Sequence, residues 1–210
     1  MTILDISRTL VTGTAVWPGD TPYSMVKVLE RSQGHAVNLT TLTLSAHTGS
    51  HVDAPLHFAD VDESIDQMDL KLYWGHAQVV TSAKPAGPLF PDDFAGYDLS
   101  LAPRLLVRSP ASDLEQTVFP AEYVYPTPEL AAHLAGQGVI LFGSDAPSMD
   151  TMDNKSLAGH NALLRHGVAI LEWLDLRHAA DGLYELVALP LKIAGGDGSP
   201  VRAALRMDLS

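Results

Sequence analysis

The sequence predicts a mixed α/β fold that is rich in β-structure, with helices outside a mainly β core. Two observations lead to this prediction: short β-type runs recur along the whole chain, and only two segments carry clear helix signals. The length of 210 residues and the apolar share of 46% fit one domain over residues 1–210 with a sizeable core. We therefore expect a single β-rich α/β domain.

The predicted strands are short runs rich in β-branched and other apolar residues, bounded by turn residues. They cover residues 2–7, 24–30, 37–44, 76–82, 104–109, 139–144, 168–176, 185–193 and 201–209. The stretch 84–103 is instead rich in Pro, Gly and Asp, which are turn-forming residues. We expect a long surface excursion there.

Both predicted helices lie in the second half of the chain. In the segment 127–138, Thr127 can cap the helix and Pro128 suits its first turn. The second helix runs through SLAGHNALLRHG, and Gly167 is placed to end it just before the next strand. Two helices against many strands make the sheet the main element of the fold.

Composition excludes several classes of function. A net charge of −12 opposes nucleic-acid binding, which requires a basic surface. The absence of cysteine means that any metal must be held by nitrogen and oxygen. The first residues do not form a secretion signal, and no apolar run reaches the ~18 residues of a membrane span. We expect a cytoplasmic protein that binds neither membranes nor nucleic acids.

Residues 47–57 read HTGSHVDAPLH and hold three of the nine histidines in the chain. In a helix, His47 and His51 would share one face while Asp53 and His57 would lie roughly opposite. The glycine and the proline within the run also oppose a helix. In an extended strand, every one of these four side chains points to the same side. The run is therefore predicted to be a strand that presents one polar face.

That polar face is more consistent with a metal site than with a solvated surface, because burying these groups requires a compensating charge. Further ligands are expected from His160, at the start of the second helix, and from Glu172, in the apolar run VAILEWL. The alternative for Glu172 is an edge-strand position that faces water. His133, His166 and His178 are expected on the surface.

The motif HTGSHVDAPLHF resembles the signature H-x-G-T-H-x-D-x-P-x-H-F of the metal-dependent cyclase-like hydrolases, a family that includes bacterial kynurenine formamidases. The early WPGD, the later SDAPSMD, the block HNALLRHGVAILEWL and the closing PLKIAGGDGSPVRA are also similar to those formamidases. The resemblance spans the whole chain. One departure is Ser50, where the family usually has threonine, and both residues carry a hydroxyl.

The resemblance implies a binuclear zinc site, in which manganese or another divalent cation is the alternative. His47, His51 and Asp53 would bind one zinc, and Asp53 would also reach the second. His160 and Glu172 would complete the pair of sites, with Glu172 bridging as well. Nitrogen and oxygen ligands accept several divalent cations, so the metal itself stays open.

The resemblance further implies that His57 is the catalytic acid/base and that Trp17 lines the substrate pocket. The implied fold is a swivelling β/β/α domain, usually a homodimer. The implied reaction is hydrolysis of N-formyl-L-kynurenine to L-kynurenine and formate in tryptophan degradation, with a metal-bound hydroxide as nucleophile. His57 would protonate the departing aryl amine.

Two alternatives remain at this point. One is a sister hydrolase of the same family that acts on another amide such as isatin, and the other is a non-catalytic protein that retains the metal site. Asp145 and Ser148, in SDAPSMD, either stabilise a turn or belong to the site. The glycine run in IAGGDGSPV lacks the Lys-Ser/Thr of a phosphate loop, so it predicts a turn between strands.

Overall fold

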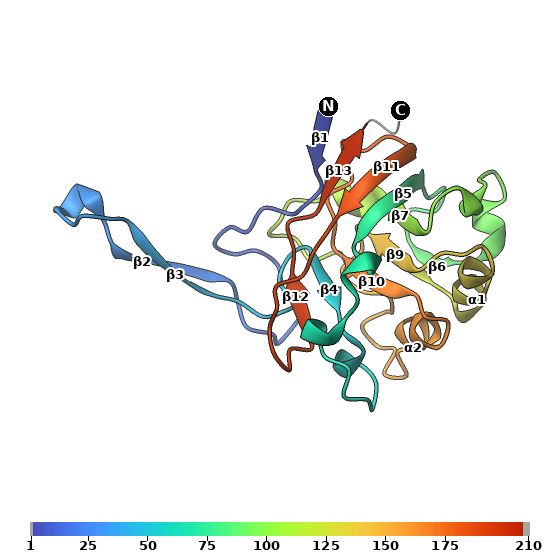
Figure 1. The fold of residues 1–210 in the computed structure, drawn as a ribbon, viewed down its shortest axis with the longest axis horizontal. Coiled ribbons are helices and arrows are strands. Elements are labelled where there is room, and N and C mark those ends of the chain that lie inside the picture. The colour runs from blue at the N-terminus through green and yellow to red at the C-terminus, as the bar shows by residue number, and fades with distance from the viewer. Residues whose placement is uncertain (1, 208–210) are drawn as a thin grey trace.

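One large curled sheet dominates the computed structural model, which describes residues 2–207 (Figure 1). Within those residues the sheet has nine strands. Their order across the sheet is β1 (Thr2–Asp5), β13 (Ala204–Met207), β11 (Gly182–Val187), β5 (Trp74–Thr81), β7 (Arg104–Arg108), β9 (Leu141–Ser144), β10 (Ala169–Glu172), β4 (His51–Asp53) and β12 (Gly198–Pro200).

The middle of this sheet is parallel. Strands β5, β7, β9 and β10 run in one direction, whereas the strands on either side of them are antiparallel. Parallel strands are covered on both faces and therefore read as continuous apolar runs. All four residues of β10 are buried, including its last residue, Glu172. That carboxylate therefore lies at the carboxyl end of a buried central strand.

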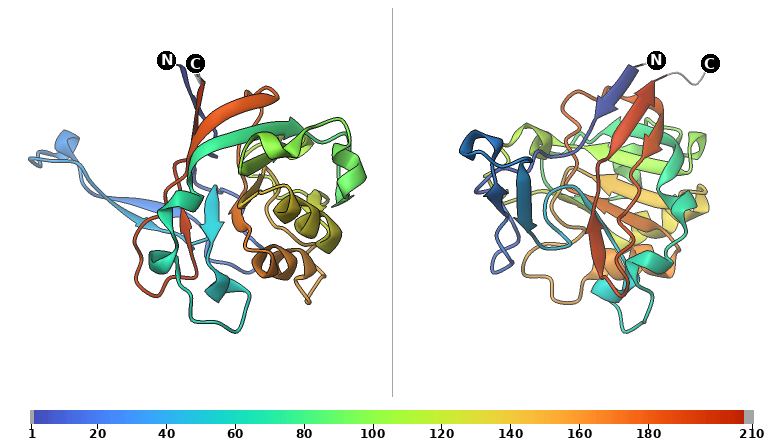
Figure 2. Two further views of the ribbon diagram at one scale, coloured as in Figure 1. Left: turned by 45° about the vertical axis from the view of Figure 1, so that its right-hand side comes forward. Right: turned by 60° about the vertical axis from the view of Figure 1, so that its left-hand side comes forward.

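The two faces of the sheet pack into two cores. Leu105 and Phe142 point to the face that both helices cover, whereas Leu106 and Leu141 point to the other core. This alternation follows the two-residue period of a strand. Figure 2 shows α1 and α2 together on one side of the curled sheet. The opposite face is closed by the other end of the same sheet, since residues of β11, β13 and β4 belong to that core.

Both helices form where the sequence predicts them. Helix α1 spans Pro128–Gly136, and its N-cap Thr127 accepts a hydrogen bond from the backbone N–H of Leu130 at 3.1 Å. Helix α2 spans Ala158–Arg165, and Gly167 follows it with a φ of +69°. The helix signals are thus confirmed, as is the strand-rich α/β class.

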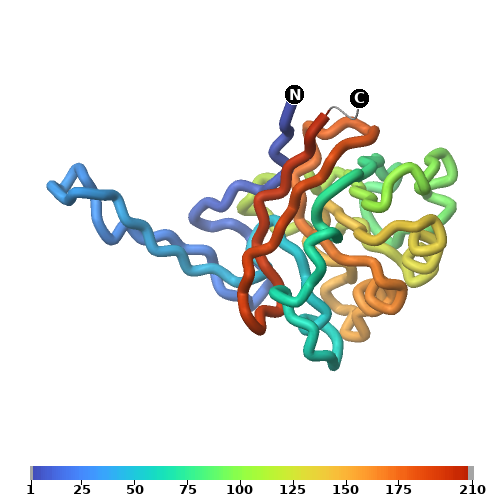
Figure 3. The backbone as a smooth tube through the Cα atoms, viewed as in Figure 1, coloured from blue at the N-terminus to red at the C-terminus, as the bar shows by residue number. Residues whose placement is uncertain are grey.

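A two-stranded arm extends from the body (Figures 1 and 3). It consists of β2 (Ser24–Leu29) and β3 (Leu39–Thr43), which pair with each other in antiparallel register and with no other strand in residues 2–207. In the arm and the loop that joins its strands, six large apolar side chains are 49–58% exposed, namely Met25, Val26, Val28, Val37, Leu39 and Leu42. The arm leaves an apolar surface uncovered within one chain.

The stretch 84–103 differs in part from its prediction. It forms β6 (Gly87–Leu89), which pairs in parallel with β8 (Val124–Pro126). Leu89, Phe94 and Leu99 are buried in the core beneath the helices. The rest of the stretch is largely exposed or half-buried, so the prediction of a surface excursion holds in part; three-residue strands and 3₁₀ turns bury the isolated apolar residues without a periodic pattern.

Seven of the nine predicted strands begin within two residues of their predicted start. The other two runs, 185–193 and 201–209, overlap only in part with the strands that form, β11 and β13. Residues 208 and 209 of the last run lie outside the described residues. No helix within residues 2–207 has the length and apolar character to cross a membrane. One domain over residues 1–210 stays a prediction.

Candidate metal centre

The clustered histidines and carboxylates meet where β4, β10 and α2 come together. Strand β4 lies between β10 and β12, with His51 opposite Glu172 and Asp53 opposite Gly198. Side chains two residues apart in a strand share a face, so His51 and Asp53 point to the same side. His160 reaches that side from the first turn of α2. Sheet register and helix placement together assemble the cluster.

The two outer histidines come from irregular backbone. His47 lies in a turn before β4, and a Cβ on Gly198 would stand 2.7 Å from its Cε1 atom, so only glycine leaves room for this ring. His57 lies on a short 3₁₀ helix. A continuous strand over 47–57 is therefore wrong beyond its central three residues. The four side chains converge nonetheless, because the turns on both sides bring the outer histidines back.

Asp53 and Glu172 are the carboxylates at the centre of the cluster. Asp53 Oδ1 lies 3.0 Å from His47 Nδ1 and 3.4 Å from His51 Nε2, and Asp53 Oδ2 lies 3.6 Å from His160 Nε2. Glu172 lies 3.3 Å from His51 Nε2 and 3.4 Å from His160 Nε2. The five side chains expected as ligands are thus in one cluster, and their coordination of a metal stays a prediction.

Two of these histidines are oriented through their other ring nitrogen. His51 Nδ1 donates to the Gly49 carbonyl at 2.8 Å, and His160 Nδ1 lies 2.6 Å from Asp150 Oδ2. Such partners fix the tautomer and the ring orientation of metal-ligating histidines. Each Nε2 atom is therefore directed toward the carboxylates, where a cation would lie.

The electrostatics of the cluster call for positive charge. Burial by itself lowers the pKa of His51, but hydrogen bonds with Asp53 and Glu172 outweigh burial and raise this pKa to about 10. For His160, burial also lowers the pKa, while Asp150 and Glu172 raise it to about 10. Burial raises the pKa of Asp53, yet its histidine neighbours hold it well below its usual value. The negative charge of the buried carboxylates is therefore balanced by protons on the histidines, unless metal cations take their place.

One structural observation indicates that the clustered residues fit a metal ion. Asp53 Oδ2 is buried and has no hydrogen-bond partner, which is costly for a carboxylate oxygen unless a cation reaches it. Two sets of three side chains each have their ligand atoms within 4.8 Å of one another. They are His51, Asp53 and Glu172 in one set, and His47, Asp53 and His57 in the other. Nitrogen and carboxylate donors of this kind suit a divalent transition metal.

His57 differs from the other histidines of the cluster in being exposed, with 38% of its side chain accessible. Its ring stacks on His47 at 3.9 Å between centroids, and its Nδ1 atom lies 3.4 Å from Asp197 Oδ2. Asp197 also lies 3.3 Å from His47 Nε2. This position at the edge of the cluster suits a group that exchanges protons with a substrate.

A cavity of about 390 Å³ opens above the cluster and is lined by five of the six clustered side chains, together with Asp197 and aromatic residues. Trp17 and Trp173 both line it. Phe119 joins these two indoles, with edge-to-face contacts at 5.7 Å to Trp17 and 5.5 Å to Trp173. The volume and the aromatic wall suit a small aromatic ligand. Trp17 lines this cavity, and its contact with a substrate stays a prediction.

Asp145 and Ser148, in SDAPSMD, are expected either to stabilise a turn or to belong to the site, and the structure places the two residues differently. Asp145 is buried, and its carboxylate accepts hydrogen bonds from the backbone and side chains of Ser109 and Ser112. It stabilises the turn. Ser148 lines the cavity. The surface positions expected for His133, His166 and His178 are confirmed.

Sequence interpretation missed Asp150 and Asp197. Asp150 accepts hydrogen bonds from the backbone N–H groups of Gly159 and His160 at 2.9 and 3.0 Å, besides contacting the His160 ring. It caps α2, whose N-cap Leu157 makes no side-chain cap. Both missed aspartates lie in blocks that carry the family resemblance, SDAPSMD and GGDGSPV, and that was the available signal.

Replacing Asp150 by asparagine is expected to weaken metal binding by roughly 10- to 100-fold, because His160 loses the charged partner that orients its ring. Titration against a chromophoric chelator measures this affinity. Asp153→Asn is the matched control, because Asp153 is exposed and contacts Thr151 rather than a clustered histidine. Equal affinity in the Asp150 variant and the wild type would contradict the orienting role.

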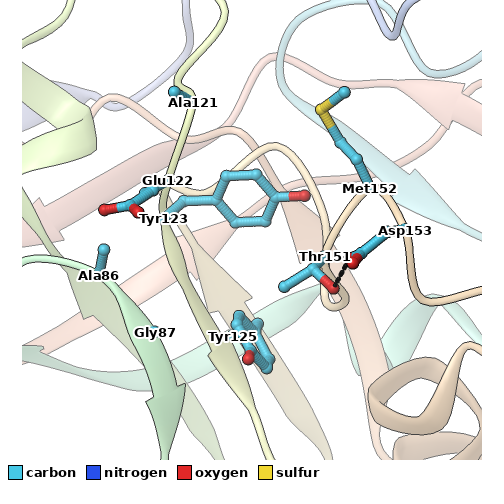
Figure 4. Close-up of a pocket in the computed structure, with 9 residues that line it drawn as sticks. All are labelled: Ala86, Gly87, Ala121, Glu122, Tyr123, Tyr125, Thr151, Met152 and Asp153. Carbon is cyan, nitrogen blue, oxygen red and sulfur yellow. Dashed lines mark hydrogen bonds between the residues drawn. The ribbon is translucent and has the colours of Figure 1, made fainter.

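A second cavity of about 530 Å³ lies behind this segment (Figure 4). Tyr123 forms part of its wall, and the Tyr123 hydroxyl donates to the Asp150 carbonyl at 2.8 Å. Thr151, Met152 and Asp153 form the facing wall. Within residues 2–207, neither candidate metal-ligand set has a member in the lining of this second cavity. Tyr123, in the wall of the second cavity, therefore helps to hold the segment that carries Asp150.

Comparison with known proteins identifies the family of this chain. The Cyclase family matches residues 4–151. The chain is 42% identical to the kynurenine formamidase of Geobacillus thermodenitrificans, covering 97% of this chain and 96% of the relative. It is 41% identical to that of Salinibacter ruber, with 98% of each covered.

Solved structures share the fold at lower identity. A potential metal-dependent hydrolase with cyclase activity superposes with a TM-score of 0.83 at 24% identity, covering 97% of this chain and 96% of that one. Isatin hydrolase A from Labrenzia aggregata gives 0.82 at 24% identity, with coverages of 99% and 94%. The near-full-length likeness to the formamidases therefore confirms the resemblance in HTGSHVDAPLHF: this chain belongs to the Cyclase family and, within it, to the kynurenine formamidases.

Proposed function

We propose that this protein is an arylformamidase that hydrolyses N-formyl-L-kynurenine to L-kynurenine and formate. The observation that carries the proposal is the placement of the His/Asp/Glu cluster beneath an aromatic-walled cavity, with His57 exposed at its edge. Relatives about 40% identical over the whole chain are kynurenine formamidases, which supports the same reaction here. The protein is accordingly a metal-dependent hydrolase of a formamide C–N bond.

Two zinc ions are the proposed cofactor. His51, Asp53 and Glu172 would hold a metal together with His160, while His47 and Asp53 would hold its neighbour. Bound divalent cations would supply Lewis acidity, which lowers the pKa of water from ~15.7 toward ~7. The two buried carboxylates keep this position anionic, so that cations are retained in a pocket whose lining has no lysine or arginine.

In the reaction, water adds to the formyl carbon and the C–N bond then breaks. One proton of the water must end on the departing aryl amine. In our proposal His57 would deliver it; this role is supported by its ring, which lines the cavity, and by its Nδ1 atom, which lies 3.4 Å from Asp197 Oδ2. The aryl ring of the substrate would lie against Trp17 and Trp173, away from bulk water.

The proposal is tested by incubating the purified protein with N-formyl-L-kynurenine and following kynurenine release. Hydrolysis is expected from metal-replete protein and is expected to stop after chelation and return when zinc or manganese is added. Isatin is the comparison substrate, because isatin hydrolases share the fold. Ring opening of isatin without kynurenine release would assign the protein to the sister activity.

We further propose that the protein is a homodimer in which the β2–β3 arm packs on a second copy. Six large apolar side chains on the arm are about half exposed, and such surfaces usually mark contacts with other proteins. A second copy is the partner that is always present with the chain. Sedimentation equilibrium is expected to give twice the chain mass, and a monomer would contradict the proposal. A cytoplasmic location stays a prediction.

A further inference from the structure

The WPGD segment forms a tight turn that contributes to the wall of the cavity. The backbone N–H of Asp20 donates to the Trp17 carbonyl at 2.9 Å, which closes a four-residue turn. Proline is the second residue of this turn, and Gly19, the third, has a φ of +94°. These are the residues that a type II turn requires. The first and last residues of such a turn lie side by side, so Trp17 and Asp20 are neighbours, and both line the cavity.

One carboxylate oxygen of Asp20 accepts no hydrogen bond from the described residues. Its Oδ1 atom accepts the backbone N–H of Thr21 at 2.6 Å, whereas Oδ2 has no donor among residues 2–207. Asp20 is half-buried and belongs to no ion pair of the described chain. A carboxylate in this position binds a cation with hydrogen-bond donors better than it binds a neutral group. Nothing in the chemistry of the C–N bond requires it.

The lining of the cavity contains acidic residues but no lysine or arginine. These side chains suit the ammonium group of an amino-acid ligand rather than its carboxylate. The proposed substrate carries its ammonium at the far end of the aryl ketone side chain, away from the formyl group. If the formyl carbon lies over the metal cluster and the ring lies on Trp17, the amino-acid end would extend past Trp17, along the turn that carries it. Asp20 is the acidic residue of that turn, and it lines the same cavity as Trp17.

We propose that Asp20 is an ammonium subsite, which selects substrates that carry a positively charged amino group beyond the aryl ring. The inference rests on the proposed function and adds a second point of recognition to it. Trp17 contacts the ring and Asp20 the ammonium group, so the turn recognises both parts of an aromatic amino acid. The ammonium is remote from the reacting carbon, so this contact is made equally in the ground state and the transition state.

The test compares two substrates that differ only in the ammonium group: N-formyl-L-kynurenine and its deamino analogue, with hydrogen at the α-carbon. We expect the wild type to favour the amino substrate by about tenfold, the range of a hydrogen bond between charged groups, with the difference in KM rather than in kcat. In Asp20→Asn the ratio of the two kcat/KM values is expected to fall close to 1. Asparagine keeps an oxygen for the Thr21 N–H, so the turn is preserved.

Two further variants separate charge from structure. Asp20→Glu keeps the charge and is expected to retain most of the preference, whereas Asp92→Asn removes an exposed carboxylate from another part of the surface and is expected to leave the preference unchanged. Equal hydrolysis of both substrates by the wild type would overturn the subsite. An Asn variant that keeps the preference, or a Glu variant that loses it as fully as Asn does, would also overturn it.

The same measurements distinguish this inference from the proposed function. Hydrolysis of the deamino analogue by metal-replete wild type supports the formamidase reaction whether or not the subsite exists. Failure to hydrolyse either substrate would count against the formamidase reaction itself. For a readout without turnover, L-kynurenine and its deamino analogue can be titrated by calorimetry: about tenfold tighter binding of the amino compound is expected in the wild type and is expected to disappear in Asp20→Asn.

Discussion

Asp53→Asn is expected to release the bound metal and to lower kcat/KM by about 10³-fold or more. Asp53 is the carboxylate shared by both candidate ligand sets, and three histidines surround it. Replacing one carboxylate oxygen by an NH₂ group removes an anionic donor and turns a hydrogen-bond donor toward the cation. Because the metal supplies the Lewis acidity of the reaction, losing it removes several kcal/mol of transition-state stabilisation. Metal content after dialysis, measured by plasma emission spectroscopy, checks the first part, and steady-state kinetics checks the second.

The matched control for this variant is Asp145→Asn. Asp145 is also a fully buried aspartate, but its partners are Ser109 and Ser112 rather than histidines. Its substitution leaves serine donors facing an NH₂ group, so a lower melting temperature is expected with metal content retained. Loss of metal from both variants to the same degree would attribute the effect to general destabilisation and would contradict the assignment of Asp53.

His57→Gln is expected to lower kcat by 10²- to 10⁴-fold, the usual range for removing a general acid or base, while the protein keeps its metal. The defect should be smaller for a formamide of a weakly basic amine such as 4-nitroaniline, because that leaving group needs less help from a proton donor. The paired measurements are kcat for the two substrates and metal content after dialysis.

The metal measurement decides between two roles for His57. Its ring nitrogen lies within the set formed with His47 and Asp53, so the geometry by itself also allows a ligand. Its exposure and its contact with Asp197 favour proton transfer. If His57→Gln lost metal as fully as Asp53→Asn does, His57 would be a ligand rather than the proton donor.

Most of the metal cluster could be predicted from the sequence because its members are concentrated in one motif. His47, His51, Asp53 and His57 fall within eleven residues: the short strand puts His51 and Asp53 on one face, and the turns on either side bring His47 and His57 back to it. The strand-rich class could also be predicted, because runs of apolar β-branched residues are local signals. For Glu172, the buried strand of the prediction is correct and the solvated edge is not.

Tertiary structure alone decided what surrounds that cluster. Asp150 caps α2 and orients His160 from ten residues away, and Asp197 reaches His57 across 140 residues of sequence. Neither contact has a local sequence period. The burial of Leu89, Phe94 and Leu99 likewise depended on which segments pack against the helices.

Local chemistry therefore determined which side chains can bind a metal, since ligand type and short spacing are properties of the chain itself. Long-range strand register determined how they meet: β4 pairs with β10 so that His51 lies opposite Glu172, and β12 brings Gly198 beside His47. Register over such sequence separations is decided by the burial of whole strand faces, which depends on the complete set of packed elements rather than on any one run of residues.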